Sequence, residues 1–267
     1  IEYYKTMTVL QAIQKHRCTV LNGVPSMFLA LIRNPKHKDF DLGSLRNGII
    51  AGSPVTEEDY YRIREEIPGL KLHISYGQTE TSPCVSISDV EDSDQDCACS
   101  AGKVIRHCEV RILDPGGRQL SAGEDGEICV RGYQVMQGYY KLPQETGKVI
   151  DADGWLHTGD LGHLDSRGFL HVTGRMKEMI IRGGENISPR EIEAVISPGI
   201  RENKVIGLPA EVLQEMIVAC IIPEEGMTIS TTGLMSHLEN HLAYYKLPAH
   251  IVRMESFLVN ASGKVML

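Results

Sequence analysis

Three short apolar segments near the start of the chain constrain the fold most, because each ends in a turn that contains glycine. They occupy residues 18–21, 47–51 and 70–76, and stretches with helical periodicity separate them. Strands that alternate with helices are typical of a parallel α/β sheet. Ligands of such sheets bind beyond the carboxyl ends of the strands. We therefore expect the three turns to border one site.

Capping residues predict where two of the helices begin. Thr56 precedes the acidic residues 57–59, which suit the positive end of a helix dipole. Ser188 is followed by Pro189 and Glu191, the pattern of a capping box with proline at the first helical position. A further amphipathic helix is expected over residues 232–244.

The remaining patterns predict an α/β fold class with two domains. Residues 1–99 read as the α/β portion of a large domain, which residues 100–175 complete with short strands and glycine-rich turns typical of a small antiparallel β-barrel. Residues 176–267 form a separate small α+β domain.

Charge and composition exclude several classes of protein. With 27 Lys and Arg against 35 Asp and Glu, the net charge of -8 argues against nucleic-acid binding. The longest apolar run, residues 216–222, is too short for a transmembrane segment. Seven scattered cysteines without a CxxC pair indicate reduced thiols and a cytoplasmic protein.

Three polar segments are predicted to carry no metal. The acidic stretch 89–96 lacks the pattern of a calcium loop and is expected to be a solvated surface loop. Cys97 and Cys99 are expected in a polar loop, where no second ligand pair has zinc spacing. His237 and His241, four residues apart on a helix, are interpreted as solvated histidines rather than as a metal pair.

Two segments carry side chains suited to a nucleotide. Residues 76–80 combine the aromatic ring of Tyr76, a glycine at Gly77, the hydroxyl of Thr79 and the carboxylate of Glu80, which suits Mg²⁺. The carboxylate of Asp160 can accept two hydrogen bonds from a ribose diol. Ordinary turn residues are the alternative interpretation of both segments.

Taken in order, these segments resemble the AMP-forming adenylate-forming superfamily, which includes acyl-CoA synthetases, peptide-synthetase adenylation domains and firefly luciferase. Residues 22–28, 52–54, 126–132, 138–140 and 174–188 match further segments of that superfamily. Within it, residues 24–28 and 181–187 are most similar to medium- and long-chain fatty acyl-CoA synthetases.

The resemblance implies a role for each matching residue in binding ATP or AMP, Mg²⁺, a fatty acid and CoA. Tyr76 and residues Gly52, Ser53 and Pro54 would enclose the adenine, and Gly77 would border the acyl pocket. Thr79 would contact the α-phosphate and Glu80 would bind Mg²⁺. The remaining roles are ribose binding by Asp160 and Arg175, a hinge at Lys177, a pantetheine tunnel at Gly183 and Gly184, and adenylation by Lys264.

One departure from the superfamily affects the expected activity. The superfamily also uses a Ser/Thr/Gly-rich phosphate loop that ends in Pro-Lys, and no segment here matches it. We expect the chain to be the C-terminal part of a longer enzyme, with partial adenylate contacts and little catalysis alone. Two alternatives stay open: an aryl or amino-acid adenylation domain that loads a carrier protein, and a non-catalytic nucleotide-binding module.

Overall fold

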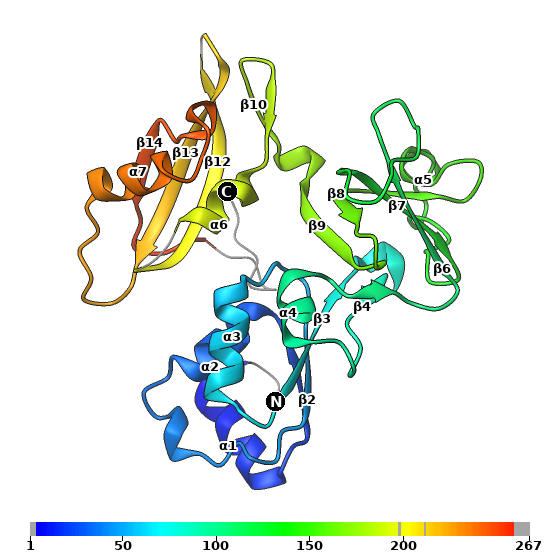
Figure 1. Cartoon of the computed structure of the whole chain (residues 1–267). Helices are drawn as coiled ribbons and strands as arrows, with labels where there is room; N and C mark the ends of the chain where they lie inside the picture. The colour runs from blue at the N-terminus through cyan, green and yellow to red at the C-terminus, as the bar shows by residue number, and fades with distance from the viewer. Residues whose placement is uncertain (1–3, 197–198, 211, 259–267) are drawn as a thin grey trace. The chain divides into compact units, whose positions relative to one another are not determined.

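The computed structural model describes residues 4–196, 199–210 and 212–258, and these divide into two compact units. The first comprises Ile1–Thr158 and Gly162–Val172, and the second comprises Gly159–Leu161 and Thr173–Leu267. The boundaries between the two units therefore fall within two consecutive strands, β8 (Leu156–Leu164) and β9 (Leu170–Arg175) (Figure 1). The domain boundary predicted at residue 175 stays a prediction.

The first unit opens with a five-stranded sheet in the order β1-β2-β3-β4-β5. The predicted parallel core is confirmed, since β1, β2 and β3 pair in parallel, and β4 and β5 add antiparallel strands. The strands are β1 (Val20–Gly23), β2 (Asn47–Ile50), β3 (Lys71–Tyr76), β4 (Ser86–Ile87) and β5 (Lys103–Val104).

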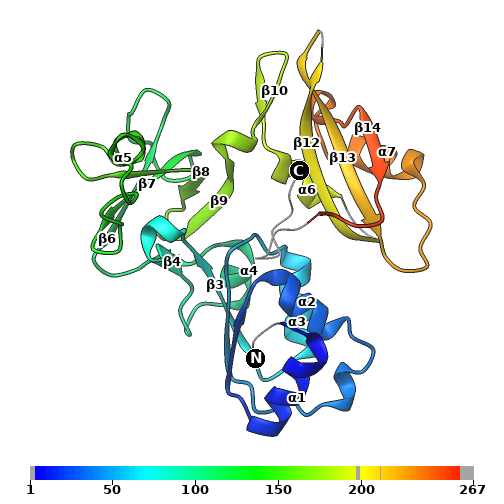
Figure 2. The ribbon, with the colours of Figure 1, turned by 180° about the vertical axis from the view of Figure 1, so that it is seen from behind.

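Helices of this unit share one apolar core with the sheet. Their buried side chains include Leu10, Phe28 and Ile63, which pack with Ile50 and Leu72 of the strands. The helices are α1 (Thr6–His16), α2 (Pro25–Ile32), α3 (Glu57–Glu66) and α4 (Asp94–Cys99), which Figure 2 shows from behind.

The predicted β-barrel is wrong. The strands form a four-stranded sheet in the order β6-β7-β8-β9, so that β6 and β9 end the sheet rather than pairing with each other. Small closed barrels need about five to eight strands. The hairpin pattern in the sequence does not reveal how many strands join one sheet, so it could not distinguish a barrel from this open sheet. The elements are β6 (Cys108–Leu113), β7 (Gly126–Gly132), α5 (Pro143–Val149), β8 (Leu156–Leu164) and β9 (Leu170–Arg175).

The second unit is an α+β module around a separate core. Its sheet has the order β11-β10-β13-β12, with β14 parallel to β13, and two helices contribute Ile192 and Leu238 to the buried cluster. The elements are β10 (Ile180–Arg182), β11 (Glu185–Ile187), α6 (Pro189–Val195), β12 (Ile200–Ala210), β13 (Gln214–Pro223), α7 (Thr231–Glu239) and β14 (His250–Arg253).

Both predicted helix starts are confirmed, since α3 follows Thr56 and α6 follows Ser188 with Pro189 at its first position, but only Thr56 forms the expected side-chain cap. The Thr56 hydroxyl accepts a hydrogen bond from the Asp59 backbone N–H, as expected. The Ser188 hydroxyl instead donates to the Thr173 carbonyl at 2.9 Å, and α6 has no side-chain cap there. A tertiary partner has replaced the local one.

The solvated loop predicted over residues 89–96 is confirmed only in part, because residues 89–91 are exposed and lie outside any helix or strand, whereas a helix begins at Asp94. Ser93 caps α4, which begins at Asp94, and the side chain of Asp92 is only 8% exposed. Cys97 lies in that helix and is fully buried, so the loop predicted around it is wrong. Apolar packing of a short helix is hard to detect in so acidic a sequence.

Of the helices described, none has the length and apolar character needed to cross a membrane.

Candidate functional site

Parallel pairing brings three predicted turns to one edge of the first sheet. Gly23 pairs with Ile50, and Ile50 pairs with Ile74, so the three strands end in the same direction and close to one register. The Ala51 N–H donates to the Gly23 carbonyl at 3.2 Å, which ties the first two turns together. The turn at Gly52, Ser53 and Pro54 that follows is exposed.

Gly77 fixes the third turn by steric necessity. A Cβ atom at this position would lie 2.0 Å from the Pro83 carbonyl oxygen, so only glycine allows the backbone to approach so closely. The next residues form a 3₁₀ turn, η2 (Thr79–Thr81), in which the Gln78 N–H donates to the Thr81 hydroxyl at 3.0 Å. Thr79 is exposed on this turn and Thr81 is fully buried.

Tyr139, to which the sequence analysis gave no role, positions the carboxylate of Glu80, the predicted Mg²⁺ ligand. The Tyr139 hydroxyl donates to Oε1 of Glu80 at 2.9 Å, and the Met136 N–H donates to the Glu80 carbonyl at 2.8 Å. The bond to Glu80 raises the pKa of Tyr139, with burial as the second cause. No local pattern reveals this pairing, since 59 positions separate the two residues.

The chemistry of this turn fits Mg²⁺. The ion prefers carboxylate oxygens and keeps several waters, so one half-buried carboxylate beside an exposed hydroxyl suffices on the protein side. Glu80 would hold it through the carboxylate that Tyr139 orients.

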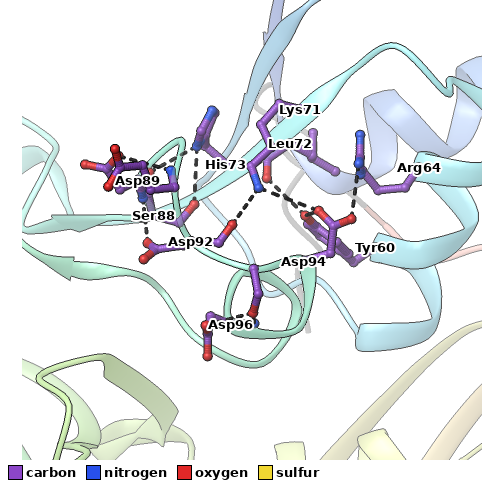
Figure 3. Close-up of polar contacts among 12 residues, drawn as sticks. Tyr60, Arg64, Lys71, Leu72, His73, Ser88, Asp89, Asp92, Asp94 and Asp96 are labelled. Carbon is purple, nitrogen blue, oxygen red and sulfur yellow. Dashed lines mark hydrogen bonds and ion pairs between the residues drawn. The ribbon is translucent and has the colours of Figure 1, made fainter.

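The strand that carries Tyr76 is fixed from both sides by polar contacts (Figure 3). On one side, Tyr60 donates to the Leu72 carbonyl at 3.3 Å and to Asp94 at 3.1 Å. On the other, Nδ1 of His73 lies 3.0 Å from the Ser88 carbonyl oxygen. These contacts hold β3, and with it the start of the turn at Gly77.

Asp94 joins α4 to both α3 and β3 (Figure 3). Its carboxylate lies 3.1 Å from Nη2 of Arg64 and 3.7 Å from Nζ of Lys71. Burial acts to raise the pKa of Asp94, but the bonds from Arg64 and Tyr60 and the nearby positive charges outweigh it and lower that pKa. The acidic segment therefore buttresses the strand.

Asp160 and Arg175, the predicted ribose pair, contact each other in the second unit. Nε of Arg175 donates to Oδ1 of Asp160 at 2.6 Å, and the Asp160 side chain is 5% exposed. Arg190, on α6, is close enough to interact electrostatically with both Asp160 and Arg175. Burial lowers the pKa of Arg190, and the charge of Asp160 opposes that shift.

The Gly183-Gly184 turn closes a tight hairpin between β10 and β11. Both glycines have positive φ, 60° and 88°, which suits the two central residues of a type I′ turn. The strand β11 begins directly after this turn, at Glu185. The predicted hinge, Lys177, is exposed in the 3₁₀ turn η3 (Met176–Glu178).

The predicted site residues are divided between the two compact units. Tyr76, Thr79 and Glu80 belong to the first unit, and Asp160, Arg175, Gly183 and Gly184 belong to the second. Lys264 lies outside the described residues.

The two histidines expected on one helix have ordinary partners, and only His237 lies on α7, because the helix ends at Glu239 and His241 follows it. Nε2 of His237 lies 3.2 Å from the Val195 carbonyl oxygen, and Nδ1 of His241 lies 2.8 Å from the His237 carbonyl oxygen. All seven cysteines are free thiols.

Two family models match the chain. The model described as AMP-binding enzyme matches residues 2–140, and that of the AMP-binding enzyme C-terminal domain matches residues 191–264.

Relatives match almost the whole chain. YngI of Bacillus subtilis, which is named as an acyl-CoA synthetase, is 39% identical over 268 residues, or 99% of this chain and 49% of YngI. The mitochondrial medium-chain acyl-CoA ligase ACSF2 of Macaca fascicularis is 36% identical over 259 residues, or 96% of this chain and 42% of ACSF2. The chain thus spans about half the length of the curated relatives it matches.

A solved structure shares the fold. ATP-bound MatB from Rhodopseudomonas palustris superposes with a TM-score of 0.90 and 29% sequence identity, covering 99% of this chain and 52% of MatB.

Proposed function

The chain belongs to the family of AMP-binding enzymes, and from this premise we propose that it is part of an acyl-CoA synthetase. The full-length enzyme would activate a fatty acid with ATP as an acyl-adenylate and then transfer the acyl group to CoA. The names of YngI and ACSF2 support this substrate class.

The observation that carries the proposal is the turn after β3. It presents the Glu80 carboxylate, oriented by Tyr139, at the sheet edge where two other glycine-containing turns end. Magnesium bound there would neutralise charge on the phosphates. Tyr76 and residues Gly52–Pro54 would enclose the adenine, and Thr79 would donate a hydrogen bond to the α-phosphate.

In the first half-reaction, a carboxylate oxygen of the acid attacks the α-phosphorus of ATP, and pyrophosphate leaves. Two anions must approach each other, so positioning and charge neutralisation dominate the barrier. Asp160 would accept hydrogen bonds from the ribose, with Arg175 holding its carboxylate in place. We assign the positive charge at the acyl carboxylate to Lys264.

In the second half-reaction, the CoA thiolate attacks the acyl carbonyl, and AMP leaves. The adenylation lysine must then withdraw, which a mobile second domain allows. We propose Lys177 as the hinge, Gly183 and Gly184 as the walls of the pantetheine tunnel, and Gly77 at the border of the acyl pocket.

The proposal is tested by thioester formation with the full-length enzyme, ATP, free CoA and a series of fatty, aryl and amino acids. Fatty acids are expected to give acyl-CoA and AMP. Thioester formed only on a carrier protein would contradict the proposal, and so would nucleotide binding without any acyl-AMP.

The isolated chain is expected to show little ATP–pyrophosphate exchange, because no segment here matches the superfamily's phosphate loop. The measurement is the exchange of labelled pyrophosphate into ATP in the presence of a fatty acid. Robust exchange by the 267-residue chain would contradict this expectation.

A further inference from the structure

A thiol, an imidazole and a carboxylate converge on one face of the β6–β9 sheet, within the first unit. Glu127 and Cys129 lie two residues apart on β7 and so point to the same face of the sheet, and His157 lies on the neighbouring strand β8. One potential ligand atom from each residue lies within 4.8 Å of the other two. None of the three has a role in the proposed adenylate chemistry.

The contacts centre on a single nitrogen atom. Nδ1 of His157 lies 2.8 Å from Oε2 of Glu127 and 3.4 Å from Sγ of Cys129. A neutral imidazole nitrogen offers either one proton or one lone pair, so Nδ1 cannot donate to the carboxylate and accept from the thiol together. A cation bound here would instead accept one lone pair from each of the three atoms.

The spacing is close to that of a zinc site. With Zn–S near 2.3 Å and Zn–N and Zn–O near 2.0–2.1 Å, tetrahedral ligands lie about 3.3–3.6 Å apart. The sulfur–nitrogen distance of 3.4 Å already falls in this range, and the nitrogen–oxygen distance of 2.8 Å must lengthen by about half an ångström.

A second carboxylate lies near the other nitrogen of the ring. Oδ2 of Asp151 lies 3.8 Å from Nε2 of His157, and Oδ1 of Asp151 accepts the backbone N–H groups of Asp153 and Trp155. Histidine ligands of zinc commonly place a carboxylate at the nitrogen that does not bind the metal. Asp151 is thus available to hold Nδ1 toward Glu127 and Cys129.

The same strand offers an internal comparison. His163 also lies on β8, and its Nδ1 contacts Oδ1 of Asp125 at 2.7 Å. This second pair is a histidine–carboxylate contact of the same kind. It does not belong to the cluster of three potential metal ligands formed by Glu127, Cys129 and His157. The thiol of Cys129, which is fully buried, distinguishes the first cluster.

We propose that Glu127, Cys129 and His157 form a binding site for Zn²⁺, with the fourth coordination position left to water. Binding replaces the thiol proton of Cys129 with a metal–sulfur bond and releases that proton to solvent. The imidazole stays neutral, with its single proton on Nε2 on the side of Asp151. No oxidation or reduction is involved. The ion would link β7 to β8.

The test is a titration of the metal-free 267-residue chain with Co²⁺ as a spectroscopic probe, followed by displacement with Zn²⁺. One equivalent of Co²⁺ is expected to give the near-ultraviolet band of a cobalt–thiolate bond, which Zn²⁺ abolishes. Cys129→Ser is expected to remove that band, and His157→Asn and Glu127→Gln to weaken Zn²⁺ binding by at least about tenfold. Asp151→Asn is expected to weaken it by about tenfold.

Matched variants separate this site from other metal-binding groups. His163→Asn removes the comparison histidine and is expected to leave both the band and the affinity unchanged. Far-ultraviolet circular dichroism of each variant checks folding, and Glu127→Gln tests the site again if Cys129→Ser does not fold. The proposal is overturned if the folded wild-type chain gives no thiolate band, if the band persists in Cys129→Ser, or if His163→Asn weakens binding as much as His157→Asn.

Discussion

At the scale of single residues, the two contacts that matter most to the candidate site join distant parts of the chain. Tyr139 orients Glu80, and Asp94 links Tyr60, Arg64 and Lys71 around the strand that precedes the site. Each contact depends on one hydroxyl or one carboxylate, so a substitution of one atom can test it.

Tyr139→Phe removes only the hydroxyl that donates to Glu80. A hydrogen bond to a charged group contributes about 1.5–3 kcal/mol. Because this bond is partly exposed to water, we expect a value at the lower end of that range. We expect acyl-AMP formation by the full-length enzyme to need about tenfold more Mg²⁺ for half-maximal rate, and the chain to lose on the order of 1 kcal/mol of unfolding free energy.

The control is Tyr140→Phe, because this neighbouring tyrosine is 85% exposed. Equal Mg²⁺ dependence of the Tyr139 and Tyr140 variants would show that Tyr139 does not position the carboxylate.

Asp94→Asn is predicted to remove a pH-dependent part of the stability. The folded-state pKa of Asp94 is lowered, so its contribution is present above the unfolded pKa of about 3.9 and is lost as pH falls through the folded value. Because the carboxylate is 41% exposed, the contribution at pH 7 is on the order of 1 kcal/mol.

Denaturant unfolding between pH 7 and pH 3 measures this effect. The wild-type chain is expected to lose more unfolding free energy on acidification than Asp94→Asn loses. Glu58→Gln on the exposed side of α3 is the control. Parallel curves for wild type and Asp94→Asn would contradict the prediction.

At the scale of helices, strands and turns, the glycine turn after β3 connects fold to site. Its backbone approaches the Pro83 carbonyl so closely that no side chain fits at Gly77. The turn that presents Thr79 and Glu80 therefore depends on a single missing Cβ atom.

Gly77→Ala is expected to destabilise the chain by about 3 kcal/mol, since the atom it meets belongs to the backbone and cannot rotate away. Gly147→Ala, in α5, is the control, because no atom of the described residues lies within 4 Å of its added Cβ and alanine favours the helix. Chemical denaturation of both variants measures the difference. A Gly77→Ala variant as stable as wild type would contradict the close approach.

The sequence predicted the elements whose signals are local. The parallel strands could be found because apolar runs and glycine turns mark their ends, and the helix after Thr56 because its cap is formed by neighbours. Ser188 correctly marked the start of α6, but its hydroxyl does not form the expected cap because it has a tertiary partner, the Thr173 carbonyl. Tyr139 and Arg190 were missed for the same reason, since their partners lie far away in sequence.

At the scale of the whole molecule, each compact unit holds part of the proposed adenylate site. The first unit carries Tyr76, Thr79 and Glu80, and the second carries Asp160 and Arg175. Membership of the AMP-binding enzymes supports the proposal that these residues bind a common nucleotide.

Isothermal titration of the chain with a non-hydrolysable acyl-adenylate analogue tests this central claim most directly. The wild-type chain is expected to bind one equivalent, and Tyr76→Ala and Asp160→Asn are each expected to weaken binding by about tenfold or more. Tyr133→Ala and Asp153→Asn, which alter exposed side chains of the first unit, are expected to bind like wild type. A folded wild-type chain that does not bind the analogue, or that binds it equally well without either Tyr76 or Asp160, would contradict the account.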